Sequence, residues 1–305
     1  MKTPLATESL TPMAISSATD GTSRPRVARR TVRCFLVFAL HLPLFGFGSI
    51  EGLLAPGKDL WPRWMANNPA STAHIDHAAW SAFLEKYLVA GDINQLRYAS
   101  VTTEDRQRLD SYIDGLAALP ISQYNRSEQF AYWINLYNAA TVRLVLDHYP
   151  VHSIRDINIS PGLLASGPWD KDLIAVEGER LTLNDIEHRI LRPIWNDPRL
   201  HYVLNCAARG CPNLLPRAFT ADDASRLLDQ AARVFINTRA VHIKHGKLIV
   251  SSIYDWFTED FGGSEAGVLE HLRRYAMPPL ATELANFQKI DGVDYDWRLN
   301  DADQR

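Results

Sequence analysis

The spacing of apolar side chains predicts a mostly helical chain from residue 79 onward. Apolar positions at helical spacing predict helices over residues 79–89 and 103–119, and Pro120 ends the second of these. The longest predicted helix covers residues 127–149, with Pro150 as its terminator. Shorter helices are predicted over residues 184–191 (with Asn184 as the cap), 221–236 (with Thr220 as the cap), 254–261, 267–275 and 281–287.

The predicted strands are few and short. Two antiparallel hairpins are expected, one of residues 173–176 and 180–182, the other of residues 241–243 and 248–251 around His245-Gly246. Residues 201–205 are expected to form a further strand. This pattern predicts an α+β fold: one predominantly helical globular domain, residues 75–303, with short antiparallel strands and hairpins.

The N-terminal region has a different character. Residues 1–33 are predicted to be a disordered basic leader, because they lack an apolar period and carry six basic side chains against two acidic ones. An apolar run follows from Cys34 to Phe47. A basic segment followed by a short apolar run is the arrangement found in export signals. At about 1.5 Å per residue this run is about 21 Å long, short of a ~30 Å hydrocarbon core.

Residues 34–55 are therefore expected to be either an export signal that is cleaved or an N-terminal membrane anchor that is kept. A buried core helix is the alternative to both. Export places the domain in the periplasm or another extracytoplasmic space, and an anchor would tether it to the inner membrane through residues 34–55. The net charge of −3 provides no basic field for nucleic acid, so none is expected as a partner, and membrane contact is expected only through the N-terminal segment.

Two carboxamides lie in the longest predicted helix. Asn135 and Asn138 are three residues apart and share one face with Glu128. A buried carboxamide without partners costs about 1–3 kcal/mol, so both need hydrogen bonds. They are expected either to pin a loop across the helix or to orient a catalytic residue or substrate.

A second candidate pair lies in the helix predicted over residues 184–191. Asp185 and His188 are three residues apart and can meet on one face. A carboxylate that accepts from one imidazole nitrogen raises the basicity of the other, which prepares a general base. The alternative is a capping Asp followed by a surface His.

The densest polar segment is residues 201–214. In an extended strand, His201 and Asn205 would share a face, and Cys211 would follow on a tight loop between a glycine and Pro212. If Pro212 opens a helical turn, Cys211 lies near its positive end, where a thiolate is stabilised. A cysteine with His and Asn partners can carry out acyl transfer.

Other structures compete for the same sulfurs. Cys206 and Cys211 can form a disulfide in an oxidising compartment. Together with His188 and His201 they could also supply four zinc ligands, although the spacing is loose for a zinc site. Both could instead be small buried residues without chemistry.

Five blocks of sequence resemble the bacterial branch of the domain-of-unknown-function family 547. They read FAYWINLYNAATV (130–142), GPWDKDLIAVEGERLTLNDIEHRILR (167–192), DPRLHYVLNCAARGCPNL (197–214), SSIYDWFTEDF (251–261) and VDYDWRLND (293–301), and the resemblance covers residues 79–301. The resemblance implies one helical α+β domain of the kind found in exported bacterial proteins. It implies no reaction, substrate or cofactor.

Two hypotheses of function follow. The first is an exported or membrane-anchored cysteine-dependent hydrolase or acyl-transfer enzyme acting on a peptide- or amide-like substrate, without cofactor or metal. Its candidate catalytic residues are Cys211 as nucleophile, His201 or His188 as base, Asp185 or Asn205 as orienter, and Asn135 and Asn138 as supporting donors. The alternative is a non-catalytic envelope binding or scaffold module with a structural Cys206–Cys211 disulfide. The enzyme hypothesis needs the Cys211 sulfur free, accessible and within about 4 Å of an imidazole nitrogen.

Overall fold

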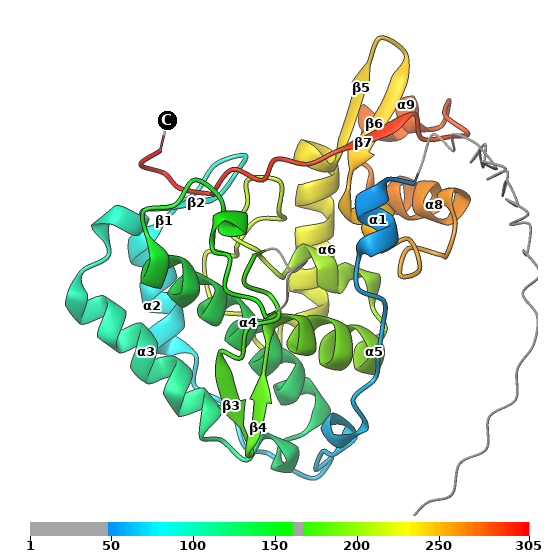
Figure 1. Ribbon diagram of the computed structural model, residues 1–305. Helices are drawn as coiled ribbons and strands as arrows, with labels where there is room; N and C mark the ends of the chain where they lie inside the picture. The colour runs from blue at the N-terminus through cyan, green and yellow to red at the C-terminus, as the bar shows by residue number, and fades with distance from the viewer. Residues whose placement is uncertain (1–47, 162–166, 305) are drawn as a thin grey trace, which may run out of the picture. The chain divides into compact units, whose positions relative to one another are not determined.

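Helix α4, Arg126–His148, is the structural centre of the described part of the chain. The computed structural model describes residues 48–161 and 167–304, which lie in one compact unit, Leu44–Arg305. Asn125 caps α4, since its side chain accepts from the backbone amides of Ser127 and Glu128, and the helix ends at His148, two residues before Pro150. Its side chains are buried on nearly every face from Glu128 to Leu146, so other elements surround it (Figure 1).

The remaining elements bring distant parts of the chain together: α1 contacts α7, and the C-terminal tail runs back beside β2 (Figure 1). Their bounds are α1 Ile50–Leu54, η1 Pro62–Met65, α2 Ala78–Tyr87, β1 Leu88–Val89, β2 Gln95–Leu96, η2 Tyr98–Ser100, α3 Thr103–Ala117, η3 Ile121–Gln123, α4, η4 Ile154–Asp156, β3 Ile174–Val176, β4 Glu179–Leu181, η5 Asp185–Leu191, α5 Arg192–Trp195, η6 Pro198–Tyr202, α6 Ala224–Phe235, η7 Ile236–Ala240, β5 Val241–Lys244, β6 Lys247–Ser251, α7 Ile253–Trp256, α8 Glu265–Tyr275, α9 Leu280–Leu284 and β7 Gly292–Asp294.

The predicted class, a predominantly helical α+β domain, is confirmed. Helices α2, α3 and α4 lie where the apolar periodicity predicts them, and both hairpins form. Each hairpin closes through two residues with positive φ, Glu177 and Gly178 in one and His245 and Gly246 in the other, as type I′ turns require. The third sheet differs from the expectation in one respect, because β7 pairs with β6 in parallel.

Several local predictions are wrong. Helix α6 begins at Ala224 and its N-cap residue is Asp223, not Thr220, and the helix expected over residues 254–261 ends at Trp256. Residues 201–205 do not form a strand, because Asp197 caps a short helix, η6, whose first residue is Pro198. Asn184 is not a cap: helical geometry begins at Leu183, and Thr182 accepts from the backbone amide of Asp185 while the Asp185 carboxylate accepts from that of Thr182. This reciprocal pair is a capping box built on Thr182.

Residues 56–66, which precede the expected start of the globular domain at 75, also pack against it. The amides of Asp59 and Trp61 donate to the carbonyls of His188 and Arg189, and Trp64 is buried against Trp133 of α4. The apolar run of residues 34–47 lies outside the described residues. Among the residues described, no helix combines the length and apolarity needed to cross a membrane.

Candidate functional site

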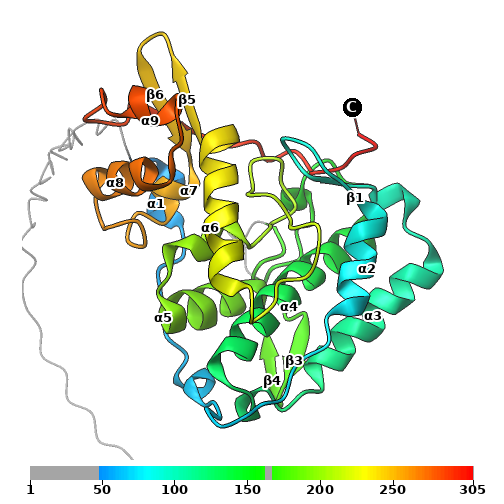
Figure 2. The ribbon, with the colours of Figure 1, turned by 180° about the vertical axis from the view of Figure 1, so that it is seen from behind.

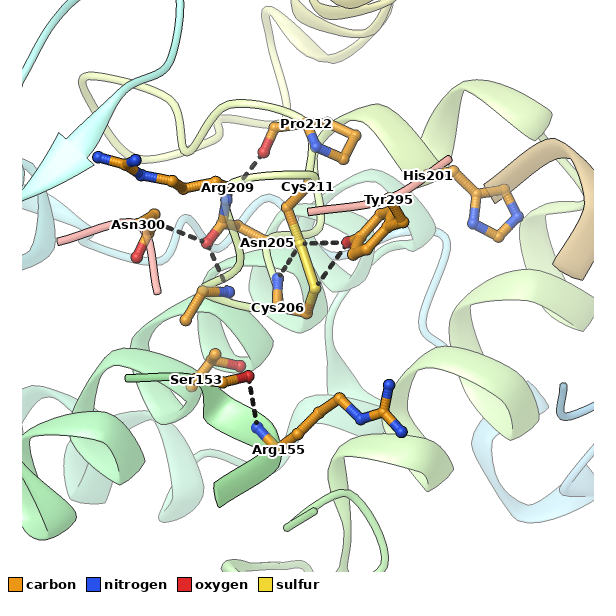
Figure 3. The surroundings of a disulfide bond; sticks show 12 residues. Ser153, Arg155, His201, Asn205, Cys206, Arg209, Cys211, Pro212, Tyr295 and Asn300 are labelled. Carbon is orange, nitrogen blue, oxygen red and sulfur yellow. Dashed lines mark hydrogen bonds between the residues drawn. A yellow bond between two sulfur atoms is a disulfide. The ribbon is translucent and has the colours of Figure 1, made fainter. Parts of the chain in front are cut away.

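The two cysteines of the segment 201–214 are joined as a disulfide (Figure 3). Cys206 and Cys211 lie five residues apart, with 6.2 Å between their Cα atoms. Two donors point at the Cys211 sulfur: the amide of Cys206, at 2.9 Å, and the hydroxyl of Tyr295, at 3.1 Å. The same hydroxyl lies 3.2 Å from the Cys206 sulfur. Cys211 is only 3% exposed, whereas Cys206 is partly exposed, so one end of the bridge is buried and the other lies nearer the surface.

Gly210 allows the C-terminal tail to cross this loop closely. Its amide donates to the carbonyl of Asp296 at 2.8 Å, and a Cβ at this position would lie 2.8 Å from the amide nitrogen of Asp296 and 3.0 Å from the ring of Tyr295. The glycine is therefore needed for close approach and not to expose the next side chain. No helical turn begins at Pro212, so that prediction is wrong.

Arg239 fixes the other side of the loop. Its guanidinium donates to the carbonyl of Cys211 at 2.6 Å, to the side chain of Asn213 at 2.9 Å, and to the carbonyl of Arg209. Burial lowers the pKa of this guanidinium from its usual value. The loop of residues 206–211 is thus held by a covalent bond, by the C-terminal tail and by a half-buried cation.

Asn138 and Asn205 connect the disulfide loop to α4. The Asn138 side chain accepts from the amide of Asn205 at 2.9 Å and donates to the carbonyl of Val203 at 2.8 Å. Asn205 in turn accepts from the amide of Ala207 at 2.9 Å and donates to the carbonyl of Pro212 at 2.8 Å. Each carboxamide uses both its oxygen and its nitrogen on nearby backbone, which matches the loop-pinning alternative.

Asn135 does the same one turn earlier in α4. Its side chain donates to the carbonyl of Phe219 at 2.8 Å and accepts from the amide of that residue at 2.9 Å. Glu128, on the same helix face, accepts from the His74 ring and from the amide of Ile75. One face of α4 therefore holds three separate segments of chain, and this is why an apolar helix carries these polar side chains.

The imidazole of His201 takes part in a buried ionic cluster and not in the disulfide. Its Nε2 lies 2.7 Å from Asp260, its Nδ1 lies 3.7 Å from Glu187, and Phe257 stacks on its ring with 4.4 Å between ring centres. In Figure 3 the Tyr295 ring lies between the bridge and His201. The sulfur–imidazole contact on which a cysteine nucleophile depends is not formed here, because Cys211 is bonded to Cys206 and His201 to Asp260.

Arg192 is the centre of this ionic cluster. It is 2% exposed and donates to Asp260 and Glu259, each at 2.7 Å, and to the carbonyl of Pro56 at 2.7 Å. Lys58 adds a contact of 2.9 Å to Asp260. Burial opposes ionisation of Asp260, but the hydrogen bond from His201 and the charges around it hold the pKa of this carboxyl well below its usual range. The cluster pins the segment that contains Pro56 and Lys58 onto the domain.

His188 has a different environment from the one predicted. It is buried, and its Nδ1 accepts from Arg192 at 2.9 Å. Burial lowers the pKa of His188 to about 4, so the ring is neutral at pH 7. Asp185 does not meet it: the carboxylate of Asp185 bonds to Thr182 and forms an ion pair of 2.9 Å with Arg189. The Asp185–His188 pair is not formed. Of the alternative, the capping Asp is confirmed, whereas the surface His is wrong because His188 is buried.

Sequence reasoning missed several residues that organise this region: Tyr295, Arg192, Asp260 and Arg239. The polar–aromatic alternation of residues 294–297 is typical of a strand, although β7 ends at Asp294, and it does not reveal that Tyr295 reaches the sulfurs. Within the described ranges 48–161 and 167–304, no group of three or more His, Cys, Asp or Glu side chains is placed to hold a metal ion.

Comparison with known proteins gives one match. A family model described as a protein of unknown function, DUF547, matches residues 121–236, which run from η3 to the end of α6 and the first residue of η7. The matched segment contains all seven candidate residues and both cysteines. No curated protein and no solved structure matches the chain.

Proposed function

We propose that this chain is an exported or membrane-anchored envelope domain that binds a partner or ligand without turning it over, and that Cys206–Cys211 is a structural bridge. The bridge carries the proposal, because a half-cystine has no thiolate with which to attack a carbonyl. Disulfides persist in oxidising compartments, which supports export by way of residues 34–55. Membership of the bacterial branch of the DUF547 family is part of the same proposal, supported by the sequence blocks outside the matched segment.

The remaining candidate residues support the same conclusion. Backbone groups are the hydrogen-bond partners of three of these side chains, those of Asn135, Asn138 and Asn205, and Asp185 caps a helix. His201 is bonded within a buried ion cluster. A catalytic base or orienting group needs an atom facing substrate, whereas these side chains face other segments of the fold.

One observation favours the cysteine-dependent enzyme as a second candidate. The amide of Cys206 and the hydroxyl of Tyr295 both point at the Cys211 sulfur, and such donors would favour a thiolate if the bridge were reduced. That enzyme would act on a peptide- or amide-like substrate only in its reduced form.

Thiol labelling separates the two functions. The full chain carrying Cys34→Ser is treated with an iodoacetamide probe before and after reduction, and labelling at positions 206 and 211 is read by peptide mass spectrometry. The structural-bridge proposal expects no labelling before reduction, and afterwards labelling of both thiols at rates that His201→Ala does not change. Selective labelling of Cys211 in the native chain, lost in His201→Ala, would overturn it in favour of the enzyme.

Localisation is tested separately. A full chain with a C-terminal epitope, expressed in a Gram-negative host, is expected in the periplasmic or inner-membrane fraction with residues 206 and 211 oxidised. Deletion of residues 34–55 is expected to leave the chain in the cytoplasm. Export that persists after this deletion would contradict the role assigned to the segment.

A further inference from the structure

A hollow of about 420 Å³ lies between η6, α6 and α8, away from the disulfide loop. Figure 2 shows α6 and α8 side by side, and the hydroxyl of Tyr275 on α8 reaches Asp229 on α6 at 3.4 Å. The volume is within the range of small-molecule sites, which is roughly 300–1,000 Å³. The walls of the hollow are rich in cationic side chains, and their pairing indicates what it would bind.

Arg199 is the cation of the hollow that is already neutralised. It forms a two-pronged pair with Asp197, at 2.6 Å for the shorter contact of the guanidinium nitrogens, and a second ion pair with Asp229 at 2.8 Å. Hydrogen bonds from Arg199 lower the pKa of Asp229 from its usual value. Both carboxylates of the hollow are thus paired with this one guanidinium.

Arg233 and Arg274 line the same hollow without such partners. Their guanidinium carbons lie 5.9 Å and 6.0 Å from the centre of the Tyr275 ring. In the described part of the chain, neither has a carboxylate within salt-bridge distance. Two guanidinium groups beside one aromatic ring repel each other unless an anion lies between them, and their planar forks match the oxygens of phosphate.

His271 adds a neutral hydrogen-bonding group. One ring nitrogen, Nε2, lies 2.8 Å from the hydroxyl of Tyr202, while the ring lines the hollow. Burial lowers the pKa of His271 to about 4, and the charge of Arg274 acts in the same direction. In the tautomer that carries its proton on Nδ1, the uncharged ring can therefore donate a hydrogen bond to an oxyanion. It does so without adding a positive charge to those of Arg233 and Arg274.

A second hollow, of about 460 Å³, adjoins the first and shares Arg233 and Asp229 with it. Val234 and Met277 line it, and these side chains are 40% and 45% exposed. The two hollows together offer a cationic compartment beside a more apolar one.

We propose that the hollow between η6, α6 and α8 binds a phosphate group, with Arg233 and Arg274 as its charged ligands and the adjoining hollow receiving the rest of the phosphate-bearing molecule. This assignment goes beyond the proposed envelope-binding function, because it names a place and a ligand chemistry, and it does not depend on the state of the disulfide. The phosphate could belong to a soluble ester or to a lipid headgroup.

The test uses the full chain and two probes. Inorganic phosphate binding is measured by isothermal titration calorimetry, and binding to vesicles of phosphatidylcholine with one part in five phosphatidylglycerol is measured by co-sedimentation. Wild-type chain is expected to bind inorganic phosphate saturably with a dissociation constant at or below about 1 mM. Vesicle binding that phosphate displaces would assign the site to a lipid headgroup, and phosphate binding without vesicle binding would assign it to a soluble ester.

The double variant Arg233→Gln/Arg274→Gln is expected to weaken phosphate binding at least about tenfold, since each charge-assisted hydrogen bond contributes a similar factor. Both side chains are exposed, and unchanged urea midpoints confirm that the variant folds. The matched control is Arg108→Gln/Arg180→Gln, which removes two exposed arginines of α3 and β4 and the same net charge. Absence of saturable phosphate binding, or equal weakening in both double variants, would overturn the proposal.

Discussion

Removal of the Cys206–Cys211 cross-link should lower the free energy of unfolding by an amount set by its short loop. The bridge closes a segment with a sequence separation of five residues. In the chain-entropy treatment, closing a loop of this length lowers the conformational entropy of the unfolded chain and so raises its free energy by about 2 kcal/mol at 25 °C. Reduction of the wild-type chain and the double substitution Cys206→Ser/Cys211→Ser should therefore cost a similar amount.

The double substitution to alanine should cost more than the one to serine. In the native chain the Cys211 sulfur accepts from the amide of Cys206 and the hydroxyl of Tyr295. A serine oxygen can replace that acceptor, whereas alanine leaves buried donors without one. We expect an additional loss of about 1–3 kcal/mol for the alanine variant.

Urea unfolding followed by tryptophan fluorescence measures these differences, since the chain has 8 tryptophans. All chains carry Cys34→Ser, and the wild-type pair is measured with and without dithiothreitol. A loss below about 0.5 kcal/mol on reduction would refute the loop-closure estimate. Equal losses in the serine and alanine variants would refute the role given to the sulfur as an acceptor.

Three further predictions concern the rest of the site. Arg192→Met should lower the free energy of unfolding by about 3–5 kcal/mol in urea titrations, because it removes the buried guanidinium that pairs with Asp260. Arg63→Met, at an exposed pair, should change that free energy by less than about 1 kcal/mol, and equal effects of the two substitutions would contradict the cluster. His188 has a pKa of about 4 in the folded chain, below its value of 6.5 in the unfolded chain, so between these pH values the unfolded chain binds more protons. The contribution of His188 to the stability of the fold is therefore complete above pH 6.5 and declines as the pH falls toward 4. This amounts to roughly 2 kcal/mol between pH 7.5 and pH 5 in urea titrations, and a His188→Gln chain with the same pH slope would argue against it. Asn138→Ala should cost about 1–3 kcal/mol and speed hydrogen exchange at the amide of residue 205, and unchanged exchange there would mean that the carboxamide does not hold the loop.

The sequence was sufficient to predict the helices and hairpins that depend on interactions between residues close together in the chain. Helices α3 and α4 follow from apolar spacing and a following proline. The hairpin of β5 and β6 follows from two strand-forming runs around His245-Gly246, whose positive φ values suit the turn. Spacing also identified Asn135 and Asn138 as polar groups on one helix face that needed partners, and it left open whether those partners were backbone or substrate.

Predictions from the local sequence pattern were wrong where the same residues fitted two different local structures. The alternation of residues 201–205 suggests a strand, but Asp197 and Pro198 start a helix three residues earlier, and the helix forms. Asp185 could pair with His188 or complete a cap with Thr182, and the cap forms because its donors are adjacent backbone amides already in place.

Only the tertiary structure decided which polar groups meet. Tyr295 reaches the Cys211 sulfur from 84 residues away, and Arg192 meets Asp260 across 68 residues. Spacing along a helix or strand relates residues within a few turns, whereas the neighbours of a buried charge are determined by how distant elements pack. For this protein, the sequence by itself therefore determined the helices, the hairpins and the list of polar candidates. The tail packs onto the disulfide loop, and residues 257–261 pack onto η5 and η6. This packing decided that the sulfurs form a bridge and that His201 faces a carboxylate, because a buried charged or polar group must take whatever partner the assembled core brings to it.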